Sequence, residues 1–125
     1  MTVVEEIILS NDLVIQVRDH SKAIAADTTK VAVEIVVPVP LRVDFFNSAE
    51  DFDLVKSVLG DPILFTVLKE RTFVDNENRE EIFTELLEDF KRDSLPYIEL
   101  PAFPSRFALS KLAEIKKYPH RHRMQ

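Results

Sequence analysis

The chain has 125 residues, of which 46% are hydrophobic, with no cysteine, no tryptophan and a single glycine, Gly60. This composition suits one folded domain whose core needs no disulfide or structural metal. One glycine argues against P-loop, Rossmann and kinase nucleotide sites, whose loops need several glycines to approach phosphates. The net charge of −6 argues against nucleic-acid binding, and no apolar run reaches the roughly 20 residues of a membrane span.

Two strands are predicted at the start of the chain. Residues 3–9 are mostly apolar, and residues 13–18 alternate between apolar and polar side chains. Residues 10–12 (Ser-Asn-Asp) predict a turn, because Asn and Asp tolerate the left-handed conformation. We therefore expect a hairpin, followed by a polar connection over residues 19–30, whose small residues Ala23, Ala25 and Ala26 could extend a strand or form a loop.

The longest apolar run, residues 31–41, predicts the central strand of a sheet. It is rich in β-branched residues, which pack well on a pleated surface. Pro38 and Pro40 lack a backbone donor, so this strand should end at an edge or bend away there. Ile35, in the middle of the run, is expected in the core.

A helix is predicted over residues 49–59, with Ser48 at its N-cap and Gly60 just beyond its last residue. Residues 63–73 follow with apolar side chains on both faces at the start. They predict a fourth strand, although periodicity over so few residues leaves a helix as the alternative.

Residues 77–93 carry the strongest amphipathic pattern of the chain and predict a second helix. At its start, Asn78 and Glu81 have the spacing of a capping pair. Residues 95–104 contain three prolines and predict an ordered linker without regular structure. A last helix is expected over residues 105–117.

These elements predict an α+β fold: a mainly antiparallel four-stranded sheet with two to three helices on one face, in the order β-β-β-α-β-α-α. We expect a single domain over residues 1–118 and a frayed basic tail over residues 119–125. Without a signal-peptide pattern or a membrane span, a cytoplasmic protein is the default expectation.

Few residues suggest catalysis or metal binding. Asp19-His20-Ser21 contains the residue types of a hydrolase triad, but neighbours in an extended chain point to opposite faces, so we interpret it as a polar strand end. His120 and His122 supply only half of a metal site. Four further carboxylates could suggest metal binding, namely Asp44, Asp51, Asp53 and Asp61. Helix caps and solvated faces explain these residues more simply. No catalytic residue, cofactor or metal is predicted.

Residues 101–106 (PAFPSR) match PxxPxR, the form of a ligand for SH3 domains. Such ligands are exposed polyproline segments, whereas aromatic residues that need burial flank this match. We interpret it as a stiff linker in which Pro104 starts a helix.

The leading functional hypothesis is a non-enzymatic protein-interaction or regulatory domain that self-associates as a homo-oligomer, such as a homodimer. It rests on the missing catalytic features and on surplus apolar side chains. The residues expected to carry the interaction are Phe45, Phe46, Tyr97 and Phe103. The alternative is a small-ligand-binding domain or a carboxylate-dependent enzyme with a pocket between sheet and helices. An unidentified protein partner is also considered, whereas membrane and nucleic acid are not expected partners.

Overall fold

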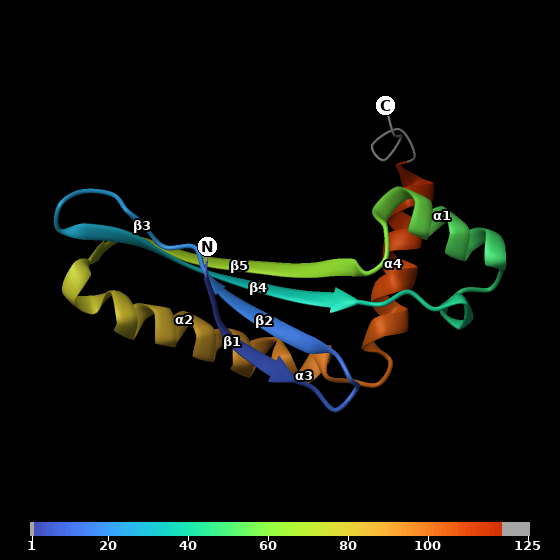
Figure 1. Ribbon diagram of the computed structural model, residues 1–125, viewed down its shortest axis with the longest axis horizontal. Coiled ribbons are helices and arrows are strands. Elements are labelled where there is room, and N and C mark those ends of the chain that lie inside the picture. Colours follow the sequence, from blue (N-terminus) through green and yellow to red (C-terminus); the bar gives the residue numbers. More distant parts are fainter. Residues whose placement is uncertain (1, 119–125) are drawn as a thin grey trace. The chain divides into compact units, whose positions relative to one another are not determined.

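The computed structural model describes residues 2–118, which form an α+β fold as predicted (Figure 1). These residues contain a mainly antiparallel five-stranded sheet, where four strands were predicted, and four α-helices. The chain divides into two compact units: residues 2–37 with 66–100 are unit 1, and residues 38–65 with 101–118 are unit 2. The division falls inside two strands, and a single domain over residues 1–118 stays a prediction. The predicted tail lies outside the described residues.

The first two strands form the predicted hairpin in unit 1. β1 (Thr2–Ile8) pairs antiparallel with β2 (Val14–Asp19). Asp12, in the turn between them, adopts a φ of 71°, the left-handed conformation for which the turn was predicted. The pairing shifts between Val3 and Glu5, which marks a β-bulge near the start of β1.

A short third strand lies in the segment for which the sequence left strand and loop open. β3 (Lys22–Ala23) lies within the expected polar connection and pairs with the central strand β4 (Thr28–Val39) in the same antiparallel register as β2. Between β2 and β3, the His20 N–H donates to the carbonyl oxygen of Ala32 at 2.9 Å. β2 and β3 therefore behave as one strand with a local interruption.

The predicted fourth strand is confirmed as β5 (Ile63–Asp75), which pairs with the other side of β4. The Asn76 N–H donates to the Asp27 carbonyl oxygen at 3.0 Å, so the end of β5 lies beside the start of β4 and the pair is antiparallel. Near this end Phe73 adopts a φ of 55°, an uncommon conformation for a bulky side chain.

Helix α2 (Arg79–Asp93) lies along one face of the sheet in unit 1 (Figure 1). Its Lys91 ammonium lies 3.5 Å from a carboxylate oxygen of Glu5 in β1. Ile35 is completely buried, as predicted. The other buried side chains of the strands and of α2 include Ile15, Val17, Val31, Val33, Val37, Leu86, Leu87 and Phe90. This layer is the core of unit 1.

Two predictions around α2 were wrong. A 3-10 turn, Asn76–Asn78, precedes the helix, and the Asn78 side chain makes no capping hydrogen bond, so the expected pair with Glu81 does not form. The linker expected to lack regular structure contains a short helix, α3 (Leu95–Ile98). Pro96 lies in its first turn, where the missing N–H needs no partner and the fixed φ favours helix.

Unit 2 contains a 3-10 turn, Val43–Phe45, and helix α1 (Ala49–Leu59), which has the predicted bounds. Ser48 caps α1 by accepting a hydrogen bond from the Asp51 N–H at 3.2 Å. Gly60 follows with a φ of 85°, and its N–H donates to the Lys56 carbonyl oxygen, so it ends the helix as predicted.

Helix α4 (Phe103–Lys117) begins two residues earlier than predicted, because Pro104 is accommodated in its first turn. Phe103 stacks on Phe107 one turn later, with ring centroids 5.8 Å apart, and Phe65 meets both rings edge-on. α4 also contacts α1, where Lys116 lies 3.1 Å from a carboxylate oxygen of Asp51. This aromatic cluster and helix pair form the core of unit 2.

Candidate functional site

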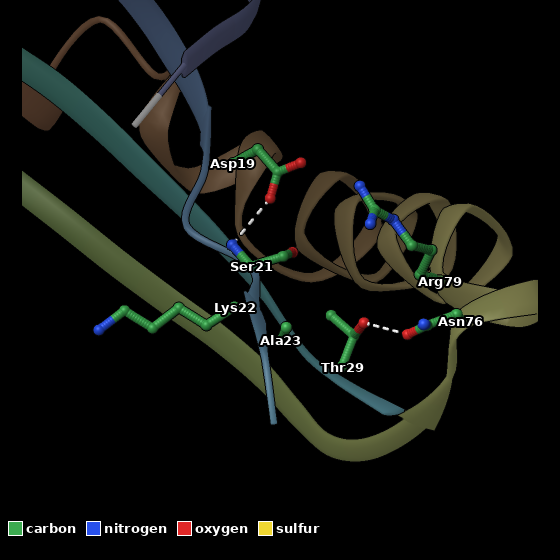
Figure 2. A pocket seen from close by; sticks show the side chains of 7 residues that line it. All are labelled: Asp19, Ser21, Lys22, Ala23, Thr29, Asn76 and Arg79. Carbon is green, nitrogen blue, oxygen red and sulfur yellow. Dashed lines mark hydrogen bonds between the residues drawn. The ribbon is translucent and has the colours of Figure 1, made fainter. Parts of the chain in front are cut away.

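A polar cleft of about 300 Å³ opens in unit 1, where the strands meet the start of α2 (Figure 2). Its main lining residues are Asp19, Ser21, Ala23 and Thr29 from the strand region and Asn76 and Arg79 from the segment that begins α2. Lys22 also lines the cleft but directs its ammonium group away from the other side chains (Figure 2).

The alternation of strand side chains explains why these residues share one face. Ile15 and Val17 of β2 are completely buried on the side that α2 covers. Continuing along the same row, the next side chains are Asp19, Ser21 and Ala23. The row therefore changes from apolar to polar, and the cleft lies at this change.

A network of hydrogen bonds fixes Asn76 in the cleft wall. The Thr29 hydroxyl donates to the Asn76 side-chain oxygen at 2.5 Å, and Thr29 is the only buried polar residue among those described. The Asn76 side-chain N–H donates to the Ala26 carbonyl oxygen at 3.2 Å, while its backbone N–H bonds to Asp27. These bonds tie the end of β5 to the loop before β4 and leave this part of the wall little freedom.

The cleft holds one carboxylate and one guanidinium group. One Asp19 oxygen accepts a hydrogen bond from the Ser21 N–H at 2.8 Å, and the Ser21 hydroxyl oxygen accepts from the Ala32 N–H at 3.1 Å. Arg79 forms no ion pair or side-chain hydrogen bond with any residue from 2 to 118. It occupies the first position of α2, where the positive end of the helix dipole disfavours a cation.

The side chains of Asp19-His20-Ser21 do not converge as a hydrolase triad. His20 Nε2 lies 2.9 Å from Glu34 Oε1, and Arg18 Nη1 lies 3.5 Å from the same oxygen. His20 thus contacts Glu34, together with Arg18, on the sheet face opposite α2, whereas Asp19 and Ser21 line the cleft.

The sheet face opposite α2 exposes several large apolar side chains of unit 1, and we call it the open face. Val3 pairs with Arg18, which is on this face, and Ile8 with Val14. Glu70 lies 2.8 Å from Lys30, and the two side chains share the open face. Leu68, two residues before Glu70 in the same strand, lies on this face too. Val3, Leu68 and Ile8 are 49%, 56% and 79% exposed.

The four residues predicted to carry an interaction occupy different environments. In unit 2, Phe46 and Phe103 are buried and Phe45 is half-buried, with its ring 6.5 Å from that of Phe46. In unit 1, Tyr97 of α3 is exposed. Phe46 and Phe103 therefore pack in the core of unit 2, and a role of the four residues in an interface stays a prediction.

Of the four aspartates singled out in the sequence, Asp44, Asp51 and Asp61 have structural partners. Asp44 forms two hydrogen bonds with the Arg42 guanidinium, which lower the pKa of the carboxyl group below its ordinary value. Asp61 accepts a hydrogen bond from the Leu41 N–H at 2.9 Å. Among residues 2–118, no three histidine, aspartate or glutamate side chains gather as a potential metal site. His120 and His122 lie outside the described residues.

The PxxPxR match does not form an extended ligand in this fold. Its last four residues, from Phe103 to Arg106, belong to the first turns of α4. The interpretation that Pro104 starts a helix is thus confirmed to within one residue. An SH3 domain would need the polyproline conformation that this helix excludes.

Sequence reasoning missed Thr29, Asn76 and Arg79 as members of a site. Their contribution depends on contacts between segments about 50 residues apart, which no local pattern predicts. One local signal was available, because an arginine at the first position of a helix opposes the preference for acids there.

Comparisons with known protein families, with curated proteins and with solved structures found no match to this chain. In the part of the chain that the structure describes, no helix is long and apolar enough to cross a membrane. The open face and the cleft of unit 1 are therefore the two features from which a function can be inferred.

Proposed function

We propose that this protein acts through protein contacts and self-associates through the open face of unit 1. The observation that supports this is the unequal cover of the sheet. α2 lies over one face, while the other exposes Ile8, Leu68 and Val3. Contiguous exposed apolar surface is typical of protein interaction sites, and the proposal is that these side chains form such a surface when two copies meet.

The charges on the open face favour a second copy as the partner. Arg18 is paired with Glu34, and Lys30 is paired with Glu70, so both signs occur on the face and compensate each other. A two-fold interface brings the same surface of both subunits together, and a face with balanced charges avoids the repulsion that a single-sign patch would meet.

The outer edge of β5 is a poorer route to self-association. Antiparallel pairing of β5 with its own copy, centred on Glu70, would place Lys69 of one chain opposite Arg71 of the other. Centring the pairing on Lys69 or Arg71 would place that residue opposite itself. Like charges directly opposite are destabilising, and charged residues commonly protect sheet edges in this way.

The test compares charge insertions on and off the open face by analytical ultracentrifugation at micromolar concentration. Leu68→Glu and Ile8→Glu would bury unpaired charges in the interface and should give monomers that remain folded. Val43→Glu is the matched control, because Val43 is 55% exposed, close to the 56% of Leu68, and belongs to unit 2. Its sedimentation should equal that of the wild type.

Two results would overturn the proposal. One is a wild-type protein that sediments as a 14.4 kDa monomer. The other is an oligomer that Leu68→Glu and Ile8→Glu leave intact.

The proposal includes no catalytic step, because His20 and Ser21 direct their hydrogen bonds to different groups. A cytoplasmic location and a further protein partner stay predictions from the sequence.

A further inference from the structure

The polar cleft of unit 1 contains two opposite charges that do not neutralise each other by direct contact. Asp19 comes from β2 and Arg79 from the start of α2, and their charged groups form no ion pair. Figure 2 shows Arg79 extending from the helix toward the side of the cleft on which Asp19 lies. A ligand that carries both charges could therefore satisfy both residues.

The hydroxyl groups of the cleft add hydrogen-bonding capacity of both kinds. The Thr29 hydroxyl uses its hydrogen on Asn76, so its oxygen lone pairs remain to accept a bond. The Ser21 oxygen accepts from the Ala32 N–H, so its hydroxyl hydrogen remains to donate. Asp19 uses one carboxylate oxygen on the Ser21 N–H, which leaves the second oxygen for a ligand.

We propose that this cleft binds a small zwitterion that carries a carboxylate and an ammonium group, of the free α-amino acid class. Arg79 binds the carboxylate, because its planar guanidinium group matches two carboxylate oxygens. Asp19 accepts from the ammonium group, and Thr29 offers a second acceptor. The position of Arg79 against the helix dipole is then explained by the ligand it binds.

The charge balance distinguishes a zwitterion from a simple ion. A simple anion attracted to Arg79 would be repelled by Asp19 and by a chain of net charge −6. A simple cation attracted to Asp19 would be repelled by Arg79. The volume of about 300 Å³ lies at the lower end of the range for small-molecule sites and suits a ligand of this size.

The experiment is a titration of the ¹⁵N-labelled full chain, followed by backbone amide chemical shifts. The probes are the standard L-amino acids, added singly at about 10 mM, a concentration that reveals dissociation constants in the millimolar range. Ethanolamine and propionate serve as half-ligands, since each carries only one of the two charges. At least one amino acid should shift the amides of residues 19–23, 29 and 76–79, and both half-ligands should bind at least tenfold more weakly.

Two substitutions test the assigned roles. Arg79→Gln and Asp19→Asn each remove one charge while keeping a similar shape, and each should weaken binding about tenfold or more, because charge-assisted hydrogen bonds are lost. Arg71→Gln is the control for the first, since Arg71 is exposed and paired with Glu85 outside the cleft. Asp12→Asn is the control for the second, because Asn equally tolerates the left-handed turn. Both controls should bind like the wild type.

Each contrary result overturns the proposal. No shift with any amino acid means that the cleft is not such a site. Propionate or ethanolamine binding as tightly as the best amino acid means a simple ion site. Equal binding by Arg79→Gln and Asp19→Asn, with dispersed spectra that show a folded chain, means that any observed shift arises elsewhere.

Discussion

Replacement of Ile35 by alanine tests the core of unit 1 most directly. Ile35 lies in the middle of β4, is 0% exposed and pairs with Val17, which is also 0% exposed. β4 has strand neighbours on both sides and α2 over this face of the sheet. The side chains around Ile35 are therefore fixed by the neighbouring strands and by α2.

The expected loss of unfolding free energy depends on the atoms that the substitution removes and on how little the surrounding side chains can move to fill the space. The substitution deletes three carbon atoms, and at about 0.8 kcal/mol for each buried methylene the lost transfer free energy alone is about 2.4 kcal/mol. A residual cavity adds to this, and we expect a total of about 3–4 kcal/mol, within the range of about 2–5 kcal/mol for such truncations.

Urea denaturation followed by far-UV circular dichroism measures this cost. The midpoint should fall while the slope of the unfolding free energy with denaturant stays unchanged, so that the shift reports stability. Ile24→Ala is the control with the same chemistry, because Ile24 is 43% exposed in the loop before β4, and we expect less than about 1 kcal/mol for it. A loss below about 1 kcal/mol for Ile35→Ala would refute its assignment to the core.

Three further predictions concern unit 2. Ser48→Ala removes the N-cap bond to the Asp51 N–H and should cost about 1 kcal/mol in urea denaturation, whereas an unchanged midpoint would show that the cap contributes nothing. Phe103→Ala removes a ring that is 1% exposed and stacked on Phe107, and should cost about 3–5 kcal/mol by the same assay; a cost below about 1 kcal/mol would contradict this packing. In a ¹³C NMR titration, Asp44 should show a pKa below that of an ordinary aspartate because Arg42 hydrogen-bonds its charged form, and Arg42→Gln should raise it. Because the folded-state pKa of Asp44 is lowered, this pair contributes to stability above the unfolded-state pKa, and the contribution disappears as the pH falls through the folded-state pKa. If Arg42→Gln left the pKa of Asp44 unchanged, the contact would be contradicted.

The larger elements of the fold could be predicted because their signals are local. Residues 49–59 had a cap, an apolar face and a terminal glycine, and the observed helix has those bounds. β3 was left open between strand and loop because two residues, Lys22 and Ala23, carry no periodicity, and only their register with β4 makes them a strand. α3 was missed because the three prolines of the segment suggested irregular structure, although proline in a first helical turn is compatible with helix.

The candidate sites could be predicted only in part. Alternation indicated that Asp19 and His20 point to opposite faces, and their different partners follow from this. The sequence offered no way to place Arg79 in the same cleft as Asp19, because that arrangement depends on how β5 returns the chain to the start of β4. Phe46 and Phe103 were expected to carry an interaction, and the packing of unit 2, which no local pattern predicts, buries both side chains.

The open face and the cleft use opposite sides of the same strands, so the two proposals can fail separately. Arg18 contributes to the open face, and Asp19, the next residue, contributes to the cleft. A substitution such as Leu68→Glu changes only the open face, and Arg79→Gln changes only the cleft. Self-association without amino-acid binding would retain the first proposal alone, and binding by a monomer would retain the second alone. Loss of both functions through either substitution would instead mean that the sheet transmits changes from one face to the other.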